Sequence, residues 1–295
     1  MRTSGEGESV ADVLQVATGR LEQAGVLNPK REATALWAAV AGLSPGDVWL
    51  RRDGEPERSL AGRFWEAVER RASGTPFPYA VGRASFRKLV LKTDARALIP
   101  RPETEGLVEL VLEWGAGKRG ARTGGIAADV GTGCGCIALS LAVEGAFDRI
   151  VAVERSPRAA ALARENVAQV APPVPVEVRE GDLLAPLAGE RYRAIVSNPP
   201  YLTTAEYDAL DPSVRGFEPR EALASGGDGL DATRALLAGA APLLEPGGIL
   251  AIEIDERRGD AVRALAHEFG WRRIGIHDDL FGRPRFALAF PREDA

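Results

Sequence analysis

The chain has 295 residues, of which 45% are hydrophobic and 27% charged, a composition typical of one or two soluble globular domains. No stretch approaches ~18 uninterrupted apolar residues, and the first residues contain no apolar signal region, so we expect a cytoplasmic protein without a membrane partner. The net charge of −5 argues against a protein that grips long duplex nucleic acid through its phosphates. Cys134 and Cys136 are spaced for neither a disulfide framework nor a four-ligand zinc site, so no metal is expected.

The first part of the chain predicts helices followed by a hairpin. Apolar residues recur at helical spacing from Ser9 to about Gly25, from Pro29 to Gly42, and over roughly residues 57–72. Residues 1–75 are therefore expected to form a small helical bundle. Residues 84–93 (A-S-F-R-K-L-V-L-K-T) alternate as a strand does, so residues 76–100 are expected to be a linker with a β-hairpin.

A helix is predicted over residues 103–114, and short apolar strands alternate with helices from Ile126 onward. We expect strands at 126–130, 149–153, 174–179, 193–197, 248–254, 272–277 and 285–290, and helices at 135–144, 157–169, 230–244 and 258–269. This alternation predicts an α/β domain over residues 101–295, with a mostly parallel sheet covered on both faces. Only D-D-L-F-G-R-P separates the last two strands, which predicts an antiparallel final pair. The arrangement resembles the class I (Rossmann-like) methyltransferases, which implies S-adenosylmethionine as the cofactor instead of NAD.

A glycine loop follows the first strand of the predicted α/β domain. Residues 128–136 read A-D-V-G-T-G-C-G-C, with the spacing G-x-G-x-G instead of the dinucleotide pattern G-x-G-x-x-G. Glycines let the backbone turn sharply and approach a ligand at the carboxyl edge of the sheet. The candidate cofactor-binding residues of this loop are Gly131, Thr132, Gly133, Cys134 and Gly135.

Two further strand ends carry candidate cofactor ligands. Glu154 ends the next strand, about 20 residues after the loop, where an acidic side chain can accept hydrogen bonds from ribose hydroxyls. Asp182 and Leu183 follow the third strand, where the first could accept the adenine amino group and the second could line the face of the base. The three strand ends converge on one crevice of a parallel sheet, although each feature alone is also compatible with an ordinary turn or surface charge.

The fourth predicted strand ends in S-N-P-P-Y, residues 197–201. A planar amide or amine nitrogen is a poor nucleophile because its lone pair is delocalised, so a methylating site must hold both N–H groups in a fixed orientation. The Asn198 side-chain oxygen and the Pro199 carbonyl can each accept one hydrogen bond, and Pro200 stiffens the turn. Tyr201 can pack on the flat substrate group. This predicts catalysis by orientation, without a strong general base.

The glycine loop D-V-G-T-G-C-G and N-P-P-Y occur together with I-P-R-P-E-T-E upstream and F-E-P-R-E-A-L-A-S-G-G-D-G-L downstream. With these motifs, nearly the whole chain resembles the HemK/PrmC protein-glutamine N5-methyltransferases. The resemblance implies methyl transfer from S-adenosylmethionine to the Gln of the Gly-Gly-Gln loop of peptide chain release factors. It also implies that the N-terminal helices help to recognise that protein partner.

The resemblance assigns the binding of the cofactor to the glycine loop, Glu154, Asp182 and Leu183. It assigns the binding of the glutamine to the N-P-P-Y residues, of which Asn198 also borders the cofactor. It further implies that two segments shape the substrate mouth, namely Arg101, Pro102 and Glu103 in the first and Glu218, Pro219 and Arg220 in the second. Three positions depart from the family pattern. Glu154 replaces the usual Asp, Cys134 replaces Ser or Thr, and D-E-R-R (residues 255–258) replaces a Gly with a nearby Gln.

Two other methyl acceptors share the same geometric requirement. N-P-P-Y also occurs in adenine-N6 and cytosine-N4 DNA methyltransferases, which flip a base into the site. The net charge of −5 and the lack of a large basic segment disfavour DNA, and no direct nucleic-acid binding is expected. A sister enzyme that methylates a glutamine of a large-subunit ribosomal protein usually has S-P after I-P-R, whereas this chain has P-E-T-E. A non-catalytic nucleotide-binding module is the remaining alternative. We expect a monomer.

Overall fold

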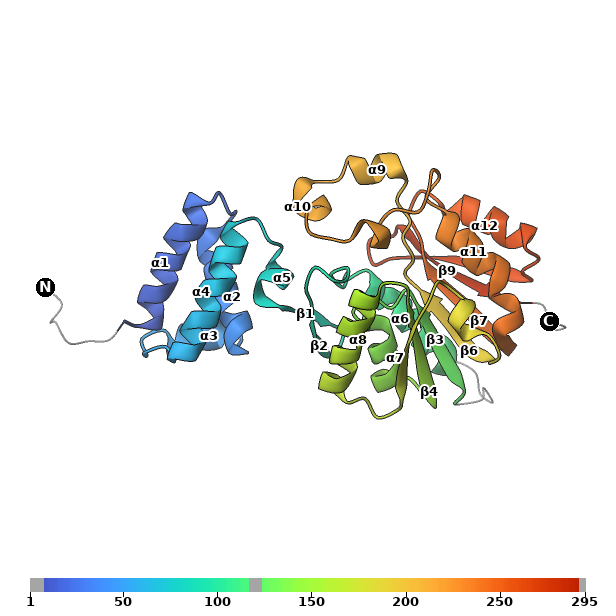
Figure 1. The fold of residues 1–295 in the computed structure, drawn as a ribbon, viewed down its shortest axis with the longest axis horizontal. Helices are drawn as coiled ribbons and strands as arrows, with labels where there is room; N and C mark the ends of the chain where they lie inside the picture. Colours follow the sequence, from blue (N-terminus) through green and yellow to red (C-terminus); the bar gives the residue numbers. More distant parts are fainter. Residues whose placement is uncertain (1–7, 117–123, 292–295) are drawn as a thin grey trace, which may run out of the picture. The chain divides into compact units, whose positions relative to one another are not determined.

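Residues 8–116 and 124–291 are described by the computed structural model of the chain, which divides into two units, Met1–Arg83 and Ala84–Ala295 (Figure 1). Residues 1–7, 117–123 and 292–295, which belong to the domains expected at 1–75 and 101–295, lie outside the described residues. The two units are described separately below.

The first unit contains five helices in the described part of the chain: α1 (Val10–Gln23), α2 (Pro29–Ala41), α3 (Pro45–Arg51), α4 (Arg58–Ala72) and α5 (Phe77–Val81). Helix α1 begins where expected because Ser9 and Asp12 form a capping box, each side chain accepting a hydrogen bond from the other's backbone N–H. Trp37 and Phe64 are buried edge to face in the core, with ring centroids 4.9 Å apart. Helices α3 and α5 were not predicted, although Ser44 and Asp47 form a second capping box at the start of α3.

The second unit begins with a small two-stranded sheet, β1 (Arg83–Phe86) and β2 (Leu89–Lys92), and helix α6 (Thr104–Ala116). The large sheet has seven strands in the order β5-β4-β3-β6-β7-β9-β8. Its strands are β3 (Ile126–Val130), β4 (Arg149–Glu154), β5 (Val176–Glu180), β6 (Tyr192–Ser197), β7 (Leu244–Glu253), β8 (Arg273–Asp278) and β9 (Pro284–Phe290). The first five are parallel to one another, while β9 pairs antiparallel with both β7 and β8. The predicted class I methyltransferase sheet with a reversed last strand is confirmed.

Helices cover both faces of this sheet (Figure 1). Alternate strand residues such as Ala127 and Ile150 pack with α6, α7 (Cys136–Glu144) and α8 (Pro157–Val170). The intervening residues, such as Ala128 and Val151, pack with α11 (Asp231–Gly239) and α12 (Gly259–Glu268). Because successive side chains of a strand point to opposite faces, strands covered on both sides are apolar along most of their length, as in the run Ile150–Val153 of β4.

Two boundaries near β7 differ from those expected. The helix expected at 230–244 ends at Gly239, and a short 3₁₀ turn, Ala241–Leu243, follows it. Strand β7 begins at Leu244 instead of residue 248, because Leu244 pairs with Tyr192 before a register shift restores regular pairing at Ala194 and Ile249. The sequence E-P-G-G at 245–248 has the composition of a turn, and the irregular pairing accommodates it within the strand.

The segment between β6 and α11 forms no strand of the sheet. It contains α9 (Thr204–Asp208), α10 (Pro212–Arg215) and a 3₁₀ turn at Arg220–Ala222, none of them predicted. The start and the end of this segment lie side by side. The N–H of Leu202 donates to the carbonyl of Leu223, and the N–H of Ser225 donates to the carbonyl of Leu202. The chain order reverses between β3 and β6, and such a reversal opens a ligand crevice at the carboxyl ends of the strands.

Candidate active site

A cavity of about 660 Å³ lies at the carboxyl ends of the parallel strands, entirely within the second unit. It is lined by seven of the residues expected in the site: Gly131, Gly133, Glu154, Asp182, Leu183, Asn198 and Pro200. Residues of the segment after β6, from Pro219 to Gly226, and residues 96–98 complete the wall. The cavity therefore brings together the ends of β3, β4, β5 and β6, as the chain reversal at the centre of the sheet requires.

The glycine loop turns tightly at the end of β3. Gly131, Gly133 and Gly135 have φ values of +75°, +57° and +88°, a region that side chains other than glycine rarely adopt. A Cβ added at Gly131 would meet no atom within 4 Å, so space beside the backbone is open there. The loop is anchored to β4, because the N–H groups of Gly131 and Thr132 both donate to the carbonyl of Val153 at 2.9 Å.

Asp129 holds the loop from inside the protein. Its Oδ2 atom accepts hydrogen bonds from the Thr132 hydroxyl at 2.6 Å and the Ala138 N–H at 3.0 Å. Burial raises the pKa of Asp129 to about 7, against the opposing effect of these two bonds, and the nearby Glu154 charge raises it further. Thr132 is therefore a buried support of the loop and does not line the cavity.

Glu154 has the arrangement that a ribose ligand requires. Its Oε2 atom accepts the N–H of Gly133 at 2.9 Å, and its Oε1 atom accepts the N–H of Ser156 at 2.8 Å. A carboxylate oxygen can accept about two hydrogen bonds, so each oxygen retains one acceptor position while the carboxylate borders the cavity. The open space at Gly131 and this oriented carboxylate fit a nucleoside such as that of S-adenosylmethionine.

The turn after β5 forms the next part of the wall. Leu183 has a φ of +45°, an unusual value for a non-glycine residue, and a Cβ added at Gly181 would come within 2.4 Å of Pro186. The side chain of Asp182 is 63% exposed and lies 3.8 Å from Arg155. This arrangement leaves the Asp182 carboxylate accessible to a ligand.

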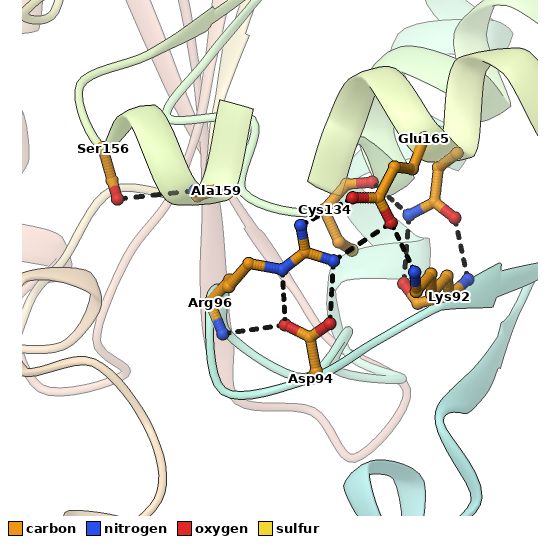
Figure 2. Close-up of polar contacts among 8 residues, drawn as sticks. Lys92, Asp94, Arg96, Cys134, Ser156, Ala159 and Glu165 are labelled. Atoms are coloured by element: carbon orange, nitrogen blue, oxygen red, sulfur yellow. Dashed lines mark hydrogen bonds and ion pairs between the residues drawn. The ribbon is translucent and has the colours of Figure 1, made fainter. Parts of the chain in front are cut away.

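Figure 2 shows the polar contacts that join α8 to the segment following β2. Arg96 forms ion pairs with Asp94 at 2.8 Å and with Glu165 of α8 at 2.7 Å, and Arg96 also borders the cavity. The amide of the buried Asn166 donates to the carbonyl of Cys134 at 2.8 Å and to the carbonyl of Lys92 at 3.0 Å. Cys134 is thus a buried loop residue, bound through its backbone.

The N-P-P-Y turn is held by two residues that were not predicted as site residues in their own right. The Asn198 Nδ2 group donates to the Thr104 hydroxyl at 3.0 Å, and that hydroxyl donates to Oε2 of Glu253 at 2.7 Å. The Tyr201 hydroxyl lies 3.5 Å from Oε1 of the same carboxylate. Pro199 is buried, and neither it nor Tyr201 lines the cavity.

Both residues left a signal in the sequence. Thr104 stands within the I-P-R-P-E-T-E segment, and Glu253 is a charged residue inside the apolar run I-L-A-I-E-I. Burial raises the pKa of Glu253 to about 7, while the Thr104 hydrogen bond and the Arg285 charge oppose that rise. Burial also raises the pKa of Tyr201 to about 12, and the Glu253 charge adds to this effect.

The two segments expected to shape the substrate mouth meet through one ion pair. Arg101 contacts Glu218 at 2.5 Å, joining R-P-E to E-P-R across 117 positions of the chain. Burial raises the pKa of Glu218, whereas the charge of Arg101 lowers it. Arg220 is exposed and stacks over the ring of Tyr207 at 5.3 Å, and neither it nor Glu103 lines the cavity.

The unusual D-E-R-R segment ties the end of β7 to the segment between β6 and α11. Arg258 forms ion pairs with Asp255 at 3.0 Å and with Glu206 of α9 at 2.7 Å, and it donates to the carbonyl of Asp228 at 2.9 Å. Arg257 contacts the same two carboxylates, at 2.9 Å and 2.8 Å. These contacts hold the end of β7 against the segment between β6 and α11, part of which lines the cavity.

Comparison with known proteins agrees with the fold described above. Residues 12–82 match the PrmC N-terminal domain family, and residues 118–228 match the methyltransferase small domain family. Among solved structures, a methyltransferase from Pyrococcus furiosus superposes with a TM-score of 0.53 at 19% identity, covering 75% of this chain and 98% of that one. The hMettl16 catalytic domain gives 0.56 at 16% identity, covering 86% and 90%. These likenesses concern the fold, and together with the domain match they define a class I methyltransferase.

The relatives identify the family more closely. The release factor glutamine methyltransferase of Moorella thermoacetica is 42% identical over 287 residues, covering 97% of this chain and all of the relative. The enzyme of the same name from Deinococcus radiodurans is 41% identical over 278 residues, covering 94% and 97%. The chain belongs to the family of release factor glutamine methyltransferases. No helix in the described ranges is long and apolar enough to cross a membrane.

Proposed function

We propose that the protein transfers the methyl group of S-adenosylmethionine to the side-chain amide nitrogen (N5) of the Gln in the Gly-Gly-Gln motif of peptide chain release factors. The observation that carries this proposal is the position of Asn198, which borders the cavity while its amide nitrogen is engaged by Thr104. The side-chain oxygen is then the atom left to accept a hydrogen bond from a substrate. Relatives that carry this name, at 42% and 41% identity, support the choice of acceptor.

The site residues divide between two tasks. Glu154 would accept hydrogen bonds from the ribose hydroxyls, and Asp182 and Leu183 would border the adenine; all three line the cavity. The glycine loop leaves room for the ligand beside Gly131. S-adenosylmethionine, when bound, supplies an electrophilic methyl group on a sulfonium. A cavity of about 660 Å³ is of the size that accommodates a ligand with a methionine and an adenosine part.

Asn198 and Pro199 orient the glutamine. The side-chain oxygen of Asn198, a residue that borders the cavity, accepts one N–H of the substrate amide. The family resemblance assigns the second N–H to the Pro199 carbonyl, and two such bonds would direct the nitrogen lone pair toward the methyl group. As the bond between the nitrogen and the methyl carbon forms, the bond between that carbon and the donor's sulfur breaks and leaves a neutral thioether, and the nitrogen loses one proton to solvent. Because orientation and fixed acceptors supply the catalysis, no strong base is required. Arg101 with Glu218 and the N-terminal helices are the parts assigned to hold the release factor, and the enzyme acts as a cytoplasmic monomer.

The decisive experiment uses S-adenosylmethionine labelled in its methyl group. We expect label on an unaltered release factor and none on a release factor whose Gly-Gly-Gln glutamine is replaced by Ala. Parallel reactions contain large-subunit ribosomal proteins or DNA. Label that persists on the altered factor, or that appears only on ribosomal protein or DNA, would contradict the proposal.

Asn198→Ala tests the assigned role within the enzyme. We expect methyl transfer to fall at least about 10²-fold, the effect of removing one fixed polar group from a transition state. The Kd for S-adenosylmethionine, measured by calorimetry, should stay within about twofold. A large loss of cofactor affinity would place Asn198 in cofactor binding instead.

A further inference from the structure

Glu253 is a carboxylate buried at the end of β7, where it does not line the cavity and takes no part in the steps described above. Its side-chain oxygens contact two hydroxyl groups, Thr104 at 2.7 Å and Tyr201 at 3.5 Å. Through Thr104 it reaches Asn198, and through Tyr201 it reaches the other end of the same turn. A single carboxylate therefore contacts both ends of N-P-P-Y, directly at one and through a hydroxyl at the other.

The direction of these hydrogen bonds determines which atom Asn198 presents to a substrate. An ionised carboxylate only accepts, so the Thr104 hydroxyl must donate its one hydrogen to Glu253. The oxygen of Thr104 is then an acceptor for Asn198, which must turn its NH₂ group toward Thr104. The carbonyl end of the amide is consequently the end available to the cavity. An Asn side chain without this constraint could present either end.

We propose that Thr104 and Glu253 are positioning residues that fix the amide orientation of Asn198, so that its oxygen accepts an N–H of the substrate glutamine. This inference rests on the proposed function. It adds the residues that determine which end of the Asn198 amide faces the substrate. The same carboxylate steadies Tyr201, which limits rotation of the turn at its far end.

Protonation of Glu253 would reverse the chain of hydrogen bonds. A carboxylic acid can donate to the Thr104 oxygen, which frees the Thr104 hydrogen to donate to the Asn198 oxygen. Asn198 would then present NH₂ to the substrate NH₂, and two donors repel. The groups that act on the charge of Glu253 are Arg285 of β9, Tyr201 and Glu103. Burial outweighs the lowering effect of Arg285 and leaves the pKa of Glu253 at about 7, so the reversal sets in as the pH falls through about 7.

The test is a series of variants of the full chain, assayed with release factor and S-adenosylmethionine. Thr104→Val removes the hydroxyl with little change of shape and should lower kcat about 10- to 100-fold, the cost of a poorly oriented reactive group. Thr104→Ser restores the hydroxyl and should recover most of kcat. Cofactor Kd and Tm, measured on the same samples, should change little between Thr104→Val and Thr104→Ser.

The pH profile separates orientation from packing. In the unaltered enzyme, kcat should fall as the pH decreases through about 7, when Glu253 takes up a proton. Glu253→Gln removes this titration, so the acidic limb should be absent; because its amide can either accept from Thr104 or donate to it, kcat should not exceed that of the unaltered enzyme at high pH. A purely structural role would lower Tm without changing the shape of the profile.

Thr93→Val is the matched control. Thr93 is also fully buried, but its hydroxyl has no hydrogen-bond partner within the described part of the chain, so this variant should keep the unaltered kcat. The inference is overturned if Thr104→Val keeps kcat within twofold, if Thr104→Ser is as impaired as Thr104→Val, or if Glu253→Gln retains the acidic limb. Failure of the proposed function gives a different result from failure of this inference. In that case the unaltered protein itself leaves the release factor unlabelled, and the inference is overturned together with the proposed function.

Discussion

Asn166 offers a measurable link between the glycine loop and the rest of the second unit. Its side chain is fully buried and makes three hydrogen bonds: to the carbonyl of Cys134 at 2.8 Å, to the carbonyl of Lys92 at 3.0 Å, and from the N–H of Lys92 at 2.8 Å. Asn166→Leu keeps the number of side-chain heavy atoms and their branching at Cγ and removes all three bonds. At a net value of about 1 kcal/mol for each bond, the free energy of unfolding should fall by about 3 kcal/mol.

Scanning calorimetry and cofactor titration measure the two consequences. For a domain of about 150–250 residues, a loss of about 3 kcal/mol lowers Tm by roughly 6–12 °C. The Cys134 carbonyl also loses its partner, so the glycine loop becomes less well ordered. We expect the affinity for S-adenosylmethionine to fall at least about tenfold, equivalent to about 1.4 kcal/mol.

Gln169→Leu provides the control on the same helix. Gln169 is exposed and makes one hydrogen bond to the neighbouring segment, to the carbonyl of Val90 at 2.9 Å. A single exposed bond predicts a loss below about 1 kcal/mol and no change in cofactor affinity. If Asn166→Leu lowers Tm no more than Gln169→Leu and binds the cofactor normally, Asn166 does not hold the loop.

Two further predictions concern Glu154, which borders the cavity, and Asp129, which supports the glycine loop from inside the protein. Glu154→Gln should weaken cofactor binding about 10- to 100-fold, which is the value of a hydrogen bond to a charged acceptor. Glu154→Asp keeps the charge, so its cofactor affinity should stay within a few fold of the unaltered protein. Equal losses of affinity for the two variants in calorimetric titrations would show that the charge is unimportant. Burial raises the pKa of Asp129 in the folded chain to about 7 from its ordinary value of 3.8, so the unfolded chain releases this proton first as pH rises. The contribution of Asp129 to the free energy of unfolding should therefore decrease between about pH 4 and 7, by up to about 4 kcal/mol. Asp129→Asn should make Tm less dependent on pH over that range. An unchanged dependence of Tm on pH in this variant would refute the prediction.

The sheet was predictable because each strand is a short apolar run bounded by turn residues and separated from the next by a helix. The antiparallel last pair followed from the short link between residues 278 and 284, which is too short for a parallel crossover. Helices α9 and α10, of five and four residues, were not predictable, because helices this short depend on tertiary contacts more than on propensity. The start of β7 was missed because turn residues were accommodated by irregular pairing with β6.

The cavity wall could be located because parallel strands bring their carboxyl ends to one edge, so the residues after each strand converge without detailed knowledge of side chains. The support of Asn198 could not be located in this way. Thr104 and Glu253 are 149 positions apart, and their contact depends on how α6 packs on β7. Buried polar pairs of this kind are specified by register and packing, which local patterns do not contain.

The ion pair between Arg101 and Glu218 has a consequence for how this family can vary. The Glu218 side chain is only 2% exposed, so losing Arg101 alone would leave a buried carboxylate without its partner, at a cost of about 3–5 kcal/mol. Losing Glu218 alone would free a guanidinium beside the cavity wall. Replacement of either residue by itself is therefore disfavoured, whereas joint replacement by two uncharged side chains can be tolerated. The R-P-E and E-P-R segments should accordingly covary among relatives, although they are far apart in sequence.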